Sequence, residues 1–261
     1  MTDRRAPTPV VDFHVRLAPV AGAAERLLRR MDALGIERAV VCAGGVLPLF
    51  DLSRQLVEGG RTTGDPDNGA VLAAAERSGG RLVPAYFANP HRDAAAYRDA
   101  APHYRGLEVS PAVHGVALTD DRLAGLLDAA ETAGHSVYTV CLEREGCRVA
   151  DLARLAAARP EVTFVLGHTG VGNIDLYGIS LVAPLPNVLV ETSGGYTCAV
   201  AEAVAVLGAE RVLFGSEYPL QDPAVELAKL DALDLAPADR RRVTRDNALR
   251  LLGAAREEAA R

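Results

Sequence analysis

Asp12, His14 and Arg16 alternate with apolar residues in the stretch from Val10 to Leu17. Successive side chains of a β-strand point to opposite faces, so this alternation predicts a strand with three polar groups on one side. An imidazole can transfer a proton or hold a metal, and a guanidinium binds carboxylates and oxyanions. The structural alternative for such a strand is a histidine bonded to a backbone carbonyl and an arginine that reaches solvent.

Two later stretches place reactive side chains directly after apolar runs. His168 stands in a Gly-His-Thr-Gly turn, and glycine allows the backbone to turn sharply while the imidazole points away from the strand. Glu217 follows the run Val-Leu-Phe-Gly-Ser in the same way and supplies a carboxylate. We therefore predict that both groups lie at the carboxyl ends of strands.

The elements that must position these groups alternate between short apolar strands and Ala-, Leu- and Arg-rich amphipathic helices. This alternation is typical of βα units that build a parallel sheet. The predicted strands cover residues 10–17, 37–43, 81–88, 105–109, 136–142, 162–167, 187–192 and 211–215. Helices are predicted to begin near residues 21, 69, 93, 120, 148, 171, 197, 222 and 237.

Eight such strands predict one α/β domain over residues 1–261, a single (β/α)8 TIM-like barrel. Polar residues at the carboxyl ends of barrel strands line the mouth, and the first strand lies beside the eighth. We therefore expect His14, Arg16 and Glu217 to face one another, with His168 two strands further round.

Residues 44–68, rich in Gly, Asp and Thr, interrupt the alternation after the second strand. A long loop in a compact domain is usually a lid, a partner contact or disorder. We interpret the segment as an irregular lid over the mouth, because it follows the carboxyl end of a strand. A flexible surface excursion is the alternative. If it is a lid, Arg61 becomes a candidate substrate contact.

Composition narrows the class of protein further. The chain has a net charge of -6 with scattered basic residues, which argues against a nucleic-acid partner. Its four cysteines lie far apart without a Cys-x-x-Cys pair, and they are expected to be reduced and mostly buried. No apolar run has the length of a signal peptide or a membrane helix. We expect a cytoplasmic protein with a small-molecule substrate and no membrane partner, and a homo-oligomer remains an open alternative to a monomer.

Five ordered motifs resemble the amidohydrolase-related branch of the amidohydrolase superfamily. They are the opening Asp-x-His strand, the Leu-Gly-His-x-Gly strand, Asn-Val-x-Val-Glu-Thr-Ser at 187–193, Leu-Phe-Gly-Ser-Glu-Tyr-Pro at 213–219 and Asn-Ala-x-x-Leu-Leu-Gly at 247–253. The resemblance covers most of the chain. It implies a metal-dependent TIM barrel of the kind that includes small-molecule hydrolases and non-oxidative decarboxylases.

The chain departs from the pattern of this family at two ligand positions. Relatives have His-x-His in the first strand, whereas this chain has His14-Val15-Arg16, and a guanidinium offers no lone pair to a metal. The fifth strand of relatives usually supplies another histidine, but Val140 stands at the matching position. If the register shifts by one residue, Cys141 becomes a candidate thiolate ligand.

Other departures concern the carboxylates. Glu108 replaces a lysine or other polar residue of relatives, and Glu217 replaces the terminal aspartate. The remaining candidate ligands for a single zinc or manganese ion are His14, His168 and Glu217. Arg16 brings a permanent positive charge into the same space, and two cations so close together repel in a low-dielectric site. A metal-free site is therefore favoured.

Three functions remain open. The first is an enzyme, a hydrolase or carboxy-lyase, in which Arg16 binds a substrate carboxylate or oxyanion while Glu217 and His168 form the acid/base pair. The second is a mononuclear metal-dependent hydrolase on His14, His168 and Glu217. The third is a catalytically silent barrel, a binding or scaffold subunit with Arg16 and Glu217 ion-paired. The predicted substrate contacts of an enzyme are Glu108, His114, Tyr138 and Tyr218.

Overall fold

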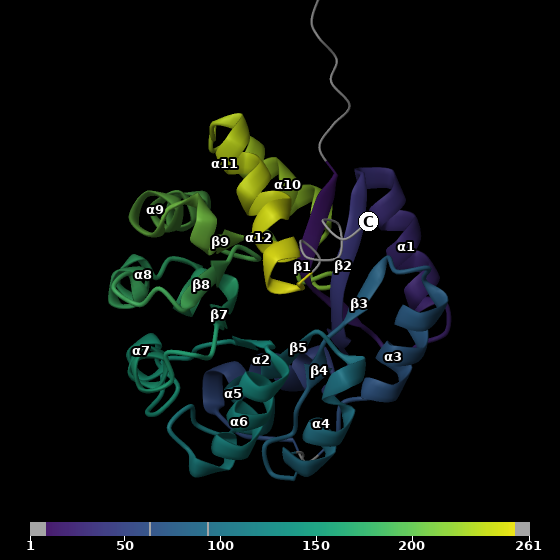
Figure 1. The fold of residues 1–261 in the computed structure, drawn as a ribbon, viewed down its shortest axis with the longest axis vertical. Coiled ribbons are helices and arrows are strands. Elements are labelled where there is room, and N and C mark those ends of the chain that lie inside the picture. The colour runs from purple at the N-terminus through teal and green to yellow at the C-terminus, as the bar shows by residue number, and fades with distance from the viewer. Residues whose placement is uncertain (1–8, 63, 93, 254–261) are drawn as a thin grey trace, which may run out of the picture.

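Parallel strands form a closed barrel surrounded by helices in the computed structural model, which describes residues 9–62, 64–92 and 94–253 (Figure 1). The strands are β1 (Val10–Leu17), β2 (Ile36–Ala43), β3 (Leu82–Pro84), β4 (Tyr86–Phe87), β5 (Gly106–Val109), β6 (Ser136–Thr139), β7 (Phe164–Leu166), β8 (Val188–Glu191) and β9 (Val212–Leu213). Only Ala85 separates β3 from β4, so the two segments form one of eight barrel strands.

Backbone hydrogen bonds close the barrel between its first and last strands. The strands pair in the orders β1-β2-β3 and β4 through β9. Phe13 N donates to Phe214 O at 2.9 Å, and Glu217 N donates to His14 O at 2.9 Å. The predicted neighbourhood of the first and eighth strands is confirmed, and with it the predicted TIM-like barrel.

β1 contains an irregularity beside the candidate site. From Asp12 to Val15 it advances three residues while β2 advances two, from Ala39 to Val41. Such a β-bulge bends the strand and redirects side chains, and bulges are common beside active sites. His14 lies within the irregular segment and is only 3% exposed.

The barrel helices lie outside the strands because each has one apolar face that packs against them. In α1, for example, Leu27 and Met31 lie one turn apart and are both buried. The helices that follow strands are α1 (Ala23–Leu34), α3 (Asn68–Arg77), α4 (Ala94–Ala100), α6 (Ala124–Ala133), α7 (Val149–Ala158), α8 (Leu176–Val182), α9 (Thr197–Leu207), α10 (Pro223–Asp231), α11 (Pro237–Arg241) and α12 (Asn247–Leu251). No helix in the described part of the chain is long and apolar enough to span a membrane.

Residues 44–68 contain a helix, α2 (Leu49–Glu58), so the prediction of a wholly irregular segment was wrong. The helix forms because apolar residues recur at helical spacing in this stretch. It packs on the short helix α5 (Pro111–His114), where Gln55 Nε2 donates to Ala112 O at 2.9 Å. Its outward side chains include Phe50 and Val57, which are 78% and 86% exposed. The role of this segment as a lid stays a prediction.

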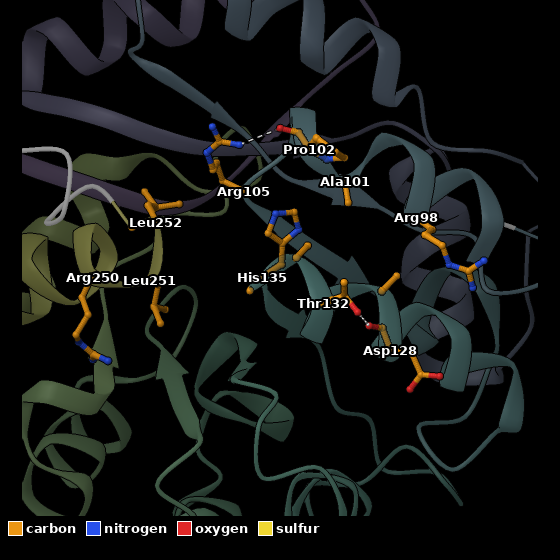
Figure 2. A pocket seen from close by; sticks show the side chains of 14 residues that line it. Arg98, Ala101, Pro102, Arg105, Asp128, Thr132, His135, Arg250, Leu251 and Leu252 are labelled. Carbon is orange, nitrogen blue, oxygen red and sulfur yellow. Dashed lines mark hydrogen bonds between the residues drawn. The ribbon is translucent and has the colours of Figure 1, made fainter.

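A groove with a volume of about 790 Å³ opens at the amino-terminal end of the barrel (Figure 2). Arg105 and His135, which directly precede β5 and β6, line it together with the end of α12. Arg98 and Arg250 add two further guanidinium groups at its edge. Active sites of TIM barrels lie at the opposite end, so this groove is separate from the candidate site described below.

Candidate active site

The carboxyl ends of the barrel strands bring the polar side chains together, because all eight strands run in the same direction. The contributing residues are His14 and Arg16 on β1, Cys42 on β2, Glu108 on β5, Tyr138 on β6, His168 just after β7, Glu191 and Ser193 at the end of β8, and Glu217 after β9. They come from positions up to 203 residues apart in sequence, as between His14 and Glu217.

Two cations and two carboxylates form a closed ring in this mouth, which we call the ion-pair ring. Arg16 Nε donates to Glu217 Oε1 at 2.5 Å, and Arg16 Nη2 donates to Glu108 Oε1 at 2.8 Å. His14 Nε2 lies 3.2 Å from Glu108 Oε2, and His14 Nδ1 contacts Glu217 Oε2. Both ring nitrogens of His14 therefore face carboxylates, which favours the doubly protonated imidazolium.

The four members of the ring hold one another in their charged forms. Burial alone would raise the pKa of Glu108, but the Arg16 charge and the hydrogen bond from His14 lower it to about 2. The pKa of Glu217 is held well below its usual value, because Arg16 and His14 outweigh burial. Burial would lower the pKa of His14, yet the Glu217 charge and its other neighbours raise it well above the usual value. At neutral pH the ring thus contains two positive and two negative charges.

Cys42 lies against the ring, although the sequence analysis assigned it no functional role. Its Sγ is 3.6 Å from Arg16 Nη1 and 3.7 Å from His14 Nε2. Burial raises the pKa of the thiol to about 11, so the thiol stays protonated at neutral pH. The register of β1 and β2 pairs Arg16 with Cys42. This register would have identified Cys42 as a neighbour of Arg16, but the sequence alone does not give the register.

Tyr138 lies behind His14 and supports it. The two rings stack with centroids 3.9 Å apart and planes 6° from parallel. The hydroxyl of Tyr138 donates to Glu191 Oε2 at 3.0 Å. Tyr138 therefore lies in the mouth with its hydroxyl bonded and its side chain buried, and its contact with a substrate stays a prediction.

A second group of residues, which we call the His168 cluster, lies on the other side of Tyr138. His168 Nδ1 is 2.9 Å from Ser193 Oγ, and Ser193 Oγ donates to Glu191 Oε2 at 2.8 Å. Ser193 N donates to Glu191 Oε1 at 2.5 Å, and His168 N donates to Glu191 Oε2 at 3.3 Å. The imidazole of His168 is half-buried and perpendicular to that of His14, with centroids 6.3 Å apart. In the sequence, Glu191 and Ser193 stand out only as parts of the motif at 187–193, and their contacts with His168 were not predicted.

Two candidate residues in the turns after β7 and β9 have strained backbones. His168 and Glu217 both have φ of 57°, in the left-handed region that costs a residue other than glycine about 1–2 kcal/mol. Glu191 holds the backbone N–H of His168, and His14 O holds that of Glu217. Backbone strain of this kind is typical of functional sites.

Asp12 fastens β1 to the turn that contains Glu217. Its carboxylate accepts hydrogen bonds from Ser216 Oγ at 2.6 Å, from Ser216 N at 3.0 Å and from His14 N at 3.3 Å. Burial raises the pKa of Asp12 to about 7 in spite of these bonds. Asp12 therefore helps to position His14 through its backbone N–H, and Glu217 through the neighbouring Ser216.

The structure places His114 and Tyr218 differently from each other. His114 is fully buried, with its ring edge-on to Phe87 at 5.3 Å, and burial lowers its pKa to about 4. Phe87 in turn lies 5.5 Å beneath the Arg16 guanidinium. Tyr218 follows Glu217 and is half-buried. Contact of either side chain with a substrate stays a prediction.

The donor set does not fit the divalent metal that the family resemblance implies. Both nitrogens of His14 contact carboxylates, and Arg16 spans Glu108 and Glu217. In residues 9–62, 64–92 and 94–253, the one group of three ligand atoms within 4.8 Å of one another belongs to His14, Cys42 and Glu108. A cation there would lie directly against the Arg16 guanidinium, which contacts Cys42 and Glu108.

The predicted ligand set of His14, His168 and Glu217 does not form such a group among those residues, and neither does Cys141. In place of a metal, Arg16 provides the positive charge between Glu108 and Glu217.

Comparison with known proteins supports the predicted family. The family model described as Amidohydrolase matches residues 53–254, which is more than half of the chain. No curated protein matches the sequence.

Solved structures with the same fold include three with named activities. A 2,6-dihydroxybenzoate decarboxylase from Rhizobium has a TM-score of 0.71 and 14% identity, covering 95% of this chain and 99% of its own. A candidate 2-pyrone-4,6-dicarboxylic acid hydrolase from Pseudomonas putida has a TM-score of 0.69 and 20% identity, covering 94% and 97%. A manganese-containing 5-carboxyvanillate decarboxylase from Novosphingobium aromaticivorans has a TM-score of 0.71 and 17% identity, covering 95% and 96%. At these identities the likeness establishes the fold.

Proposed function

This chain belongs to the amidohydrolase family, and we propose that it is a metal-independent member that hydrolyses or decarboxylates a small carboxylate-bearing compound. The observation that supports this most directly is the ion-pair ring, in which Arg16 lies between the carboxylates of Glu108 and Glu217 and provides the positive charge there. The named structural relatives act on ring compounds with carboxylate groups. We therefore propose a planar ring carboxylate or lactone as the substrate class.

Arg16 is the proposed anchor for the substrate carboxylate. Its guanidinium has five N–H bonds, of which Nε, Nη1 and Nη2 each direct one toward Glu217, Cys42 and Glu108 respectively. Two N–H bonds remain, and the side chain is 15% exposed at the mouth. A planar fork with two open donors suits a carboxylate or a developing oxyanion.

His168 is the proposed proton-transfer group. For hydrolysis, its Nε2 takes a proton from water while the water oxygen bonds to the substrate carbonyl carbon. The bond from that carbon to the leaving oxygen then breaks, and the imidazolium gives the proton to this oxygen. For decarboxylation, Nε2 first takes up a proton from solvent. The C–C bond then breaks, carbon dioxide leaves, and the imidazolium gives that proton to the carbon that keeps the electron pair. Acid–base catalysis of this kind contributes about 10²–10⁴-fold to the rate.

Glu217 takes a different role from the one expected on sequence grounds. A carboxylate whose pKa is held well below its usual value by two cations is a weak base. We therefore propose that Glu217 positions Arg16 and His14, and that His168 alone transfers the proton.

The ring itself favours a second candidate, a catalytically silent barrel. Its two positive charges are balanced by two carboxylates, so the ring is electrically neutral without a bound ligand. A silent barrel would bind or support another molecule without reaction.

A substrate screen separates these functions. The purified protein is incubated with hydroxybenzoates, methoxylated benzoates and pyrone carboxylates, with and without a chelator, while carbon dioxide release and ring opening are recorded. We expect turnover that the chelator does not reduce and that His168→Gln abolishes. His103→Gln, at an exposed position, is the matched control. Turnover that requires added zinc or manganese would contradict the metal-independent proposal, and absence of turnover and binding across the panel would favour the silent barrel.

A further inference from the structure

We infer that Ser193 and Glu191 fix the tautomer of His168, so that the proton of the neutral imidazole is on Nδ1 and Nε2 is the proton acceptor. The inference rests on the proposed function only in that it names His168 as the proton-transfer group. Ser193 and Glu191 act through His168 and are positioning residues.

The hydrogen bonds that link Glu191, Ser193 and His168 allow only one position for the His168 proton. Glu191 accepts from four groups, namely the Tyr138 hydroxyl, the Ser193 hydroxyl and the backbone N–H groups of Ser193 and His168. A serine hydroxyl has one proton, and that proton is used toward Glu191 at 2.8 Å. Toward His168, Ser193 Oγ can therefore only accept, so His168 Nδ1 must donate across the 2.9 Å contact.

The opposite nitrogen is left for chemistry. With Nδ1 protonated, the lone pair of the neutral ring lies on Nε2. Nε2 of His168 makes no hydrogen bond within residues 9–62, 64–92 and 94–253, and the side chain is half-buried rather than enclosed. A base is most effective when its orientation and tautomer are set before the substrate binds.

Glu191 also provides charge behind His168. Its side chain is fully buried, and no arginine or lysine in the described part of the chain contacts it. When Nε2 gains a proton, the imidazolium is stabilised by this carboxylate through Ser193 Oγ. A neutral hydroxyl lies between this carboxylate and His168, whereas Glu108 and Glu217 contact His14 directly.

Two glycines give this network the space it needs. A Cβ at Gly167 would overlap the Tyr138 hydroxyl, and a Cβ at Gly215 would overlap the Glu191 carboxylate. Gly167, which precedes His168, thus serves the Tyr138–Glu191 contact rather than a left-handed turn. His168 itself adopts the left-handed conformation.

Histidine nitrogen NMR tests the inference without any substrate. Protein with ¹⁵N-labelled histidine is measured at pH 8, and the His168 signals are identified by their loss in His168→Gln. We expect a protonated Nδ1 and an unprotonated Nε2 in the unmodified protein. A protonated Nε2 there would overturn the inference. The tautomer is read in the unmodified protein, and the His168→Gln variant serves only to assign the signals.

Ser193→Ala should then move the proton toward Nε2, the tautomer that an isolated imidazole prefers in water. The matched control is Thr192→Val, which removes a neighbouring buried hydroxyl that has no hydrogen-bond partner in the described structure. We expect the control to keep the native pattern. An unchanged tautomer in Ser193→Ala would overturn the role of Ser193.

Kinetics with an identified substrate provide the second readout. A wrong tautomer can lower kcat by as much as about 10⁴-fold in enzymes that depend on a histidine base. We expect Ser193→Ala to lower kcat at least tenfold with little change in KM. If the tautomer is as inferred but no substrate is found, the inference stands and the proposed function fails. If substrate is turned over with the other tautomer in place, the proposed function stands and the inference fails.

Discussion

The ion-pair ring and the His168 cluster, the two halves of the mouth, surround their histidines with different groups. His14 in the ion-pair ring has a carboxylate at each nitrogen, whereas His168 has a neutral serine hydroxyl at one nitrogen and no described partner at the other. The first arrangement raises the pKa of His14 well above its usual value and keeps the ring charged. The second leaves Nε2 of His168 without a hydrogen-bond partner in the described structure, which fits the proton transfer proposed for it. The comparison teaches that the groups around an imidazole decide which of its nitrogens are bonded and which are left open for a proposed reaction.

The same contrast applies to the carboxylates. Glu217 accepts from charged groups, and Glu191 accepts only from hydroxyls and backbone N–H groups in the described structure. Tyr138 joins the two halves, because its ring stacks on His14 and its hydroxyl bonds to Glu191. The following variants test how independent the two halves are.

The largest effect on stability is expected from breaking the ring. Glu217→Gln leaves Arg16 and His14 buried with one carboxylate between them, and loss of one partner from a buried ion pair costs about 3–5 kcal/mol. Urea unfolding measures the change. Glu143→Gln removes one partner of an exposed pair with Arg148 and should cost about 0–1 kcal/mol. A similar small cost for both variants would show that the ring does not stabilise the fold.

Acid should break the ring next. The pKa of Glu108 is lowered to about 2, so its contribution to stability is present above its unfolded value near 4.5 and is lost as pH falls toward 2. The shift corresponds to roughly 3 kcal/mol. We expect the free energy of unfolding to decrease over this range and to decrease less in Glu108→Gln. Equal slopes in the two proteins would contradict this account.

Asp12 should make the free energy of unfolding decrease as pH rises, which is opposite to the effect of Glu108. Its pKa is raised to about 7, so its contribution is present below its unfolded value near 3.8 and is lost as pH rises through 7. Stability measured from pH 4 to 8 should therefore decline. This decline is expected to persist in Glu108→Gln, because it does not arise from Glu108.

Arg16→His should convert the ring into a metal site. The change removes the competing guanidinium and supplies a second imidazole beside His14, Cys42 and Glu108. We expect about one zinc ion per chain by elemental analysis. Binding should raise the melting temperature, since free zinc at 100 times its Kd stabilises by about 2.7 kcal/mol. Zinc bound equally by the unmodified protein would refute the claim that Arg16 excludes it.

The smallest effect is expected at the junction of the two halves. Tyr138→Phe keeps the ring stacked on His14 but removes the hydrogen bond to Glu191, which should cost about 1 kcal/mol in urea unfolding. The His168 tautomer should stay the same, because Ser193 still donates to Glu191. A changed tautomer would show that the two halves are coupled through Tyr138.

Much of the fold could be predicted from the sequence, because strand and helix periodicity are local properties. The first strand was predicted as residues 10–17 and observed as Val10–Leu17. The helix α2 was not predicted, because the residues that follow it within 44–68 are rich in Gly and Asp and favour an irregular loop. His14 and Arg16 could be recognised as candidates because they alternate with apolar residues within the first strand, and His168 and Glu217 because they follow apolar strands.

The sequence by itself thus determined the barrel, its family and which strand ends bear reactive groups. Only the tertiary structure decided how those groups pair. Cys42 faces Arg16 through the register of two parallel strands, and Glu191 reaches His168 through Ser193. The physical reason is that side-chain charge and protonation depend on atoms within a few ångströms. In a closed barrel, those atoms come from strands that are distant in sequence, such as the Arg16 and Glu217 strands, 201 residues apart.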